Sequence, residues 1–130
     1  IAPQAVTPWL TKLGLAHKTS FVDGRFTTRD LSTGQRKRLA LVVALLEDRP
    51  IFVFDEWAAD QDPEFRRYFY LEVLPMLKQQ GKLVIAVTHD DRYFHCADRV
   101  VRMGAGQVLS IVEQRQVADP RDRQAPGKEG

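Results

Sequence analysis

Two short apolar runs, IFVF at residues 51–54 and LVIAV at residues 83–87, constrain the fold of this chain most strongly. Both have the length of a strand, and both are continuously apolar, which is typical of parallel strands covered on both faces. Between them, Phe65, Phe69 and Val73 recur at helical spacing. A strand, a helix and a second strand in this order predict a parallel, right-handed crossover unit.

A well-defined helix start precedes the first apolar run. Ser32, followed three residues later by Gln35, has the pattern of a capping box, and apolar residues recur at helical spacing from Leu39 to Leu46. We predict a helix that starts at Ser32 and ends before Pro50. Its second half, LALVVALL, is apolar on nearly every side and should be buried, whereas its polar first turn should face water or a polar ligand.

The first thirty residues are expected to form a surface subregion. A short amphipathic helix from Pro8 should end at Gly14, and the polar loop after it should turn at Asp23 and Gly24. His17, like His95 later in the chain, has no partner at metal-binding spacing, so both histidines are expected at the surface or in packing roles.

Cap and turn residues also mark the later elements. Asp62 and Pro63 suit the cap and first turn of the helix between the two strands, and Pro75 should kink or restart that helix. A short helix near residues 93–94 and a hairpin over residues 99–112 should follow the second strand. Residues 114–130 contain too few apolar side chains to fold and predict a disordered tail.

Composition limits the possible partners. The 130 residues can bury one core, and a formal net charge of +2 with scattered basic residues implies no extended surface for nucleic acid. The triplet Arg36-Lys37-Arg38 is expected to be a solvated helix face, although it could border a phosphate. The single Cys96 excludes an intrachain disulfide, and no apolar run reaches the length of a membrane span, so we expect a soluble piece. The start at Ile1 rather than Met suggests that sequence precedes it.

Polar side chains follow both predicted strands. Asp55 and Glu56 come directly after the first strand, and His89 follows the second. Since the carboxyl ends of parallel strands meet at one edge of a sheet, these groups should gather in one crevice. The chemistry of phosphoryl transfer suggests that Asp55 holds magnesium, Glu56 accepts a proton from the attacking water, and His89 donates to phosphate oxygens.

The first turn of the helix after Ser32 is a candidate anion site. Unpaired N–H groups and a partial positive charge lie at a helix start, and Gly34 would let a phosphate approach the backbone. The helix should be roughly 24 Å long, so its start is expected to lie far from the crevice at Asp55 and to serve the nucleotide of a second chain.

At this point the sequence resembles the nucleotide-binding domain of ABC transporters. LSTGQRKR (31–38) is similar to the signature motif, IFVFDE (51–56) to the Walker B strand with its catalytic glutamate, ADQDP (59–63) to the D-loop, and VTHDD (87–91) to the switch histidine. The motifs follow one another in the family's order. The segments LSTGQRKRLAL and DEWAADQDPEFRRYFY also resemble the sequences of the branch that exports cyclic peptides and peptide siderophores.

The resemblance implies an α/β fold, namely part of a P-loop NTPase-like three-layer sandwich with parallel strands and helices on both faces. Residues 1–30 would end the helical subdomain, and residues 31–113 would form the carboxyl-terminal half of the ATPase domain with a β-hairpin. The implied ligands are ATP and Mg²⁺. The implied site residues are Glu56 and His89 for catalysis, Asp55 for the metal, and Ser32, Thr33, Gly34, Gln35 and Asp62 for the nucleotide.

The resemblance further implies a membrane transporter. The partners would be a second ATPase domain in a head-to-tail dimer and a transmembrane domain, at the cytoplasmic face of the inner membrane. The function would be ATP hydrolysis that powers the export of a substrate, and the exporter branch suggests a cyclic peptide or a siderophore.

The sequence departs from the family pattern at several positions. Thr33 replaces the usual glycine of the signature, Ala59 replaces the usual serine of the D-loop, and the bulky Trp57 follows the glutamate. Trp57 and Trp9 are expected to be packing residues rather than stacking platforms for a base. The 130 residues contain no G-x-x-x-x-G-K-[ST] loop and no glutamine loop, so the piece alone should be inactive.

Two alternatives stay open at this stage. One is a soluble ABC-type ATPase of DNA repair or chromosome complexes, which the lack of sustained heptads mildly disfavours. The other is a truncated, non-catalytic interaction module.

Overall fold

The computed structural model describes residues 2–27 and 30–114, so the predicted disordered tail lies outside these residues except for its first position. The chain divides into a unit up to His89 and a unit from Asp90. The elements of the first unit are α1 (Pro3–Lys12), β1 (Phe21–Val22), β2 (Arg25–Phe26), α2 (Thr33–Glu47), β3 (Ile51–Asp55), the 3₁₀ turn η1 (Trp57–Asp60), α3 (Pro63–Tyr68), the π-helical turn η2 (Phe69–Val73), α4 (Leu74–Gln79) and β4 (Leu83–Val87).

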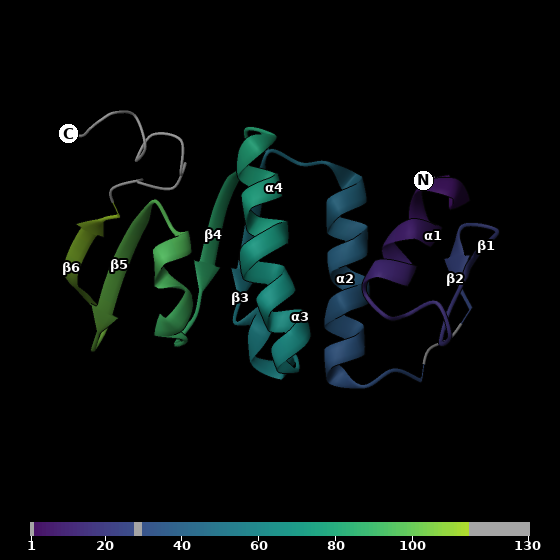
Figure 1. Ribbon diagram of the computed structural model, residues 1–130, viewed down its shortest axis with the longest axis horizontal. Coiled ribbons are helices and arrows are strands. Elements are labelled where there is room, and N and C mark those ends of the chain that lie inside the picture. The colour runs from purple at the N-terminus through teal and green to yellow at the C-terminus, as the bar shows by residue number, and fades with distance from the viewer. Residues whose placement is uncertain (1, 28–29, 115–130) are drawn as a thin grey trace, which may run out of the picture. The chain divides into compact units, whose positions relative to one another are not determined.

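The predicted order of strand, helix and parallel strand is confirmed. Strands β3 and β4 pair in parallel, with Ile51 opposite Leu83 and Asp55 opposite Val87. The elements α3, η2 and α4 run on from one another between the two strands, as one helix with a π turn in its middle (Figure 1). Pro75 lies in the first turn of α4, directly after that π turn. The wider turn accommodates a residue that cannot donate a backbone hydrogen bond.

The core of the first unit contains a cluster of aromatic rings. Phe69 packs edge-on against Phe54 at 5.0 Å between ring centroids and stacks on Trp57 at 4.5 Å. Phe52, Val73 and other apolar side chains of these elements are also buried. Trp57 is therefore a packing residue, as predicted, and it fixes the segment after β3 against the helix that follows.

Within the described chain, the two strands are covered on one face only. Phe52 and Phe54 are buried, whereas the alternate residues of β3 and the matching residues of β4 are exposed, with Val53 reaching 64%. The exposed side chains are Ile51, Val53, Leu83, Ile85 and Val87. Because Phe54 and Phe69 pack together, the helix between the strands covers one face, and the elements in residues 2–89 leave the other open.

The predicted start and end of helix α2 are confirmed. The predicted burial of its apolar second half is confirmed only in part. Ser32 Oγ accepts from the Gln35 N–H at 3.1 Å, and Gln35 Oε1 accepts from the Ser32 N–H at 2.9 Å, which is a complete capping box. In the apolar second half, Leu41 and Val42 are fully buried, residues 43–46 are half-buried, and Ala40 is exposed.

The first helix is longer than predicted. It begins at Pro3, which occupies the first turn, and it contains Pro8 in its interior. Val6 and Leu10 on its buried face hold this extra turn in the core. The predicted turn at Asp23 and Gly24 is present with φ of 52° and 76°, and it joins the short antiparallel strands β1 and β2.

Up to residue 114, the second unit contains the 3₁₀ segment η3 (Asp91–Cys96) and the antiparallel hairpin of β5 (Arg99–Gly104) and β6 (Gln107–Glu113), as predicted. Ala105 and Gly106 form its turn with φ of 51° and 75°. Cys96 is half-buried, and burial raises the pKa of its thiol. Among the described residues, no helix is both long enough and apolar enough to cross a membrane.

Candidate active site

The carboxyl ends of β3 and β4 bring Glu56 and His89 together. Glu56 directly follows the last residue of β3, and His89 follows β4 after one intervening residue. Glu56 Oε2 lies 3.1 Å from His89 Nε2. The His89 side chain is 87% exposed and that of Glu56 is 40% exposed, so both can be reached from solvent. The predicted meeting of these two groups at one strand edge is confirmed.

Asp55 lies at the same edge but borders a different element. It ends β3 opposite Val87 and lines a hollow of about 220 Å³, together with Lys37 of α2 and Val53. No group of three or more acidic, histidine or cysteine residues in the described chain is placed to hold a metal ion without other ligands. A single carboxylate nevertheless fits Mg²⁺, which commonly keeps several waters and takes its remaining ligands from phosphates.

Glu56 has an unusual backbone conformation. Its φ of 54° and ψ of 40° lie in the left-handed region, which costs a residue with a side chain roughly 1–2 kcal/mol. Its N–H donates to the Val87 carbonyl at 2.9 Å. Its carbonyl accepts from Lys37 Nζ at 2.9 Å and from the Ala59 N–H at 3.2 Å. The backbone of the candidate base is thus held from β4, from α2 and from η1.

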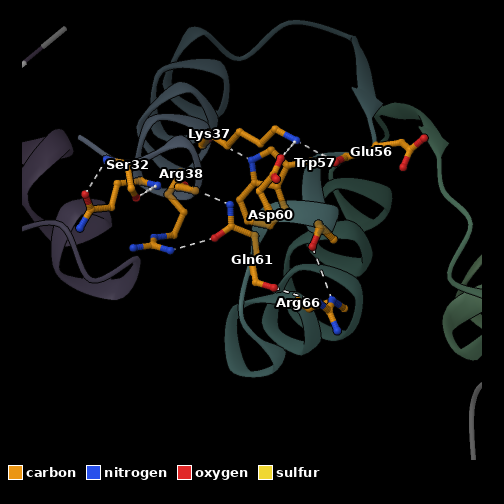
Figure 2. A network of polar contacts seen from close by, with 11 residues as sticks. Ser32, Lys37, Arg38, Glu56, Trp57, Asp60, Gln61 and Arg66 are labelled. Carbon is orange, nitrogen blue, oxygen red and sulfur yellow. Dashed lines mark hydrogen bonds and ion pairs between the residues drawn. The ribbon is translucent and has the colours of Figure 1, made fainter. Parts of the chain in front are cut away.

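A network of polar contacts joins the start of α2 to the segment after Glu56 (Figure 2). Gln61 is only 3% exposed. Its Nε2 donates to the Gly34 carbonyl at 3.0 Å, and its Oε1 accepts from Arg38 at 2.8 Å. Lys37 Nζ also pairs with Asp60 at 2.7 Å, and the Trp57 indole N–H donates to the Lys37 carbonyl at 2.9 Å. The first two turns of α2 and η1 therefore form one connected unit.

These contacts bring the second turn of α2 close to Glu56, whereas the expected distance of Ser32 from the crevice at Asp55 stays a prediction. β3 runs back along α2 in the opposite direction, so Glu56 returns toward the amino-terminal half of the helix (Figure 1). A Cβ atom added at Gly34 would lie 2.7 Å from the Asp60 carbonyl oxygen, which gives this glycine a packing role within its own chain.

The other predicted nucleotide contacts lie around the same network. Ser32 and Thr33 are exposed at the start of α2, and the side chains of Ser32 and Gln35 are engaged in the capping box. Asp62 caps α3 by accepting from the Phe65 N–H at 3.1 Å. Their roles toward a nucleotide stay predictions.

The prediction that residues 36–38 form a solvated face is wrong for two of the three. Arg36 is exposed, but Lys37 and Arg38 are half-buried. The Arg38 guanidinium lies over the Phe65 ring at 4.1 Å, and burial lowers the pKa of Arg38, an effect that Asp62 opposes. The spacing of Gly34, Arg38 and Leu41 along one helix face could have indicated this burial.

This chain is similar to known proteins in both sequence and fold. The family model "ABC transporter" matches residues 2–59. The chain is 54% identical over 106 residues to ATP-binding protein SyrD of Pseudomonas syringae pv. syringae. The aligned region covers 81% of this chain and 19% of SyrD. It is 38% identical over 79 residues to the ATP-dependent lipid A-core flippase of Nitrosococcus oceani, and this aligned region covers 61% of this chain and 13% of the flippase.

The fold is similar to that of a bacterial ABC transporter cassette, MJ0796, solved as a dimer. The TM-score is 0.69 at 21% identity, and the match covers 87% of this chain and 47% of the cassette. The chain thus spans about half of a solved cassette and less than a fifth of SyrD. The family model, the sequence relatives and the shared fold show that this chain belongs to the ABC transporter family, as part of its P-loop NTPase-like ATP-binding cassette.

Proposed function

We propose that this chain is the carboxyl-terminal half of an ATPase domain that powers an ABC exporter. The observation that carries this proposal is the Glu56–His89 pair, 3.1 Å apart at the carboxyl ends of two parallel strands. Ligands of open α/β sheets bind beyond these strand ends. A carboxylate beside an imidazole, both open to solvent, suits a reaction in which a water attacks a phosphate.

Each of these side chains has a distinct role in the proposed hydrolysis. The Glu56 carboxylate accepts a proton from the attacking water, and His89 donates a hydrogen bond to phosphate oxygens where negative charge builds up. The Glu56–His89 contact orients both side chains before ATP arrives. Asp55 would hold Mg²⁺, which neutralises phosphate charge when it is bound.

The start of α2 serves the nucleotide of a second chain in this proposal. Ser32 and Thr33 are exposed there, and the first N–H groups of a fifteen-residue helix offer hydrogen bonds and partial positive charge to an anion. The chain would therefore contribute half of each of two ATP sites in a head-to-tail dimer. The dimeric form of the cassette MJ0796 supports such an arrangement.

The proposed context is a transporter at the cytoplasmic face of the inner membrane, with a transmembrane domain as partner. The similarity to a protein named as a lipid A-core flippase supports a membrane setting. The motif sequences resemble those of an exporter branch, and this resemblance suggests a cyclic peptide or a siderophore as the transported substrate.

Two substitutions at the strand end test the enzymatic proposal in a protein that joins this chain to a phosphate loop. Glu56→Gln should lower steady-state ATP hydrolysis by about 10²–10⁴-fold and leave Mg·ATP binding intact, because it removes only the basic carboxylate. Asp55→Asn should instead weaken Mg·ATP binding itself. Hydrolysis rates and calorimetric titration with ATP distinguish the two. Near-normal turnover in Glu56→Gln would refute the assignment of the base.

The chain by itself should bind ATP weakly. Its 130 residues lack the phosphate loop, whose backbone N–H groups and lysine hold the β- and γ-phosphates. Micromolar affinity in calorimetry of this chain alone would contradict the half-site arrangement.

A further inference from the structure

The left-handed backbone of Glu56 requires support from its surroundings. A strained conformation of this kind persists only where neighbouring contacts hold it in place. The Val87 carbonyl holds the N–H of Glu56, and Lys37 and Ala59 hold its carbonyl. Of these, only Lys37 acts through a side chain, so a substitution can remove its contact and leave the main chain intact.

Lys37 contacts the segment around Glu56 on both sides. Its ammonium group donates to the Glu56 carbonyl at 2.9 Å and pairs with the Asp60 carboxylate at 2.7 Å. Its own carbonyl accepts from the Trp57 indole at 2.9 Å. Trp57 is the residue directly after Glu56, and it is fixed by stacking on Phe69. Figure 2 shows Lys37 extending from α2 to the Glu56 backbone beside Trp57.

We infer that Lys37 is a positioning residue for Glu56. It holds the Glu56 carbonyl in the orientation that the left-handed backbone requires, and this directs the carboxylate toward His89. Asp60 keeps the ammonium group at that place by ion pairing. Lys37 itself touches neither the carboxylate nor His89 in this arrangement. This inference rests on the proposed role of Glu56 as the base.

The inference predicts a specific kinetic effect. Lys37→Met keeps an unbranched side chain but removes the donor, so Glu56 can relax from its strained backbone. Misplacement of a catalytic group by a fraction of an ångström to an ångström costs on the order of 10- to 100-fold in rate. The kcat for ATP hydrolysis should fall by this factor, and KM should stay within about twofold, because Lys37 acts on the chemical step. Lys37→Arg keeps a cationic donor and should restore most of the kcat.

Lys82 provides a matched control at the opposite end of the strands. Its ammonium group also bridges a carboxylate and a carbonyl, both of Asp48, at 2.6 Å and 3.5 Å. Lys82→Met therefore removes the same kind of contact far along the strands from Glu56. We expect its kcat to remain within about twofold of the wild type, since exposed or partly exposed ion pairs contribute little to stability.

The experiment measures kcat and KM for these variants in the protein that carries the phosphate loop, in wild-type and Glu56→Gln backgrounds. If Lys37 acts through Glu56, then Lys37→Met should have little further effect in the Glu56→Gln background. An equal loss in both backgrounds would overturn the inference, and so would an unchanged kcat in Lys37→Met. Normal turnover in Glu56→Gln alone would instead overturn the proposed base, so the two failures can be told apart. If Lys37→Met does not fold, Asp60→Asn can be measured instead. This variant should lower kcat by less than the 10- to 100-fold expected for Lys37→Met, and an unchanged kcat would also count against the inference.

Discussion

Gly34→Ala should destabilise the protein without nucleotide, although alanine usually favours a helix. The added Cβ would lie 2.7 Å from the Asp60 carbonyl oxygen, which is 0.7 Å short of the 3.4 Å where ordinary contacts begin. Asp60 cannot yield easily, because the adjoining Gln61 is buried and bonded to the Gly34 carbonyl. Overpacking of this kind costs about 1–3 kcal/mol. Weakened hydrogen bonds of Gln61 add to this cost, and the helical preference of alanine offsets up to about 1 kcal/mol.

We therefore expect the free energy of unfolding to fall by about 1–3 kcal/mol in Gly34→Ala. Guanidinium unfolding followed by fluorescence is the suitable assay, because Trp57 is buried against Phe69 beside this contact. A Trp9→Phe background removes the other indole. Thr33→Ala, at an exposed neighbouring position, is the control and should stay within about 0.5 kcal/mol of the wild type. If Gly34 served only a bound phosphate, Gly34→Ala would be as stable as the control without ATP, and that result would refute the packing argument.

Two further predictions concern other parts of the first unit. The chain alone should self-associate through its open sheet face. The double substitution Val53→Lys and Ile85→Glu puts charges on that face and should lower static light scattering at equal protein concentration. Unchanged scattering would mean that the chain associates through another surface. Asp48 has a φ of 55° at the end of α2 and pairs with Lys82. Asp48→Gly and Asp48→Ala both remove that ion pair, but only glycine relieves the backbone strain. Asp48→Gly should therefore be about 1 kcal/mol more stable than Asp48→Ala in denaturant titration. Equal stability of the two variants would argue against strain at this position.

Local signals predicted most of the elements correctly. The capping box at Ser32, the cap at Asp62 and the turn before Gln107 are encoded by residues that lie next to one another in the chain. The parallel pairing of β3 and β4 followed from the order of apolar runs around a helix. The meeting of Glu56 and His89 followed from that pairing, so no long-range guess was needed.

The features that the sequence did not reveal depend on how the chain packs on itself. The coverage of the strand faces depends on which elements reach them, and a continuous apolar run does not show whether these elements lie in the same 130 residues. The burial of Lys37 and Arg38 depends on η1 folding back against α2, which no local pattern announces. Charged residues in a row suggest a solvated face, but here a carbonyl, a carboxylate and an aromatic ring take the place of water.

The measurement that tests the central claim most directly is size-exclusion chromatography of the Glu56→Gln protein with Mg·ATP. If Glu56 is the base, and if the start of α2 closes on the nucleotide of a second chain, this variant should accumulate as an ATP-bound dimer. Adding Ser32→Arg should abolish the dimer, because a large side chain would block the exposed helix start. A trapped dimer that is indifferent to Ser32→Arg, or no dimer despite tight ATP binding by Glu56→Gln, would contradict the account.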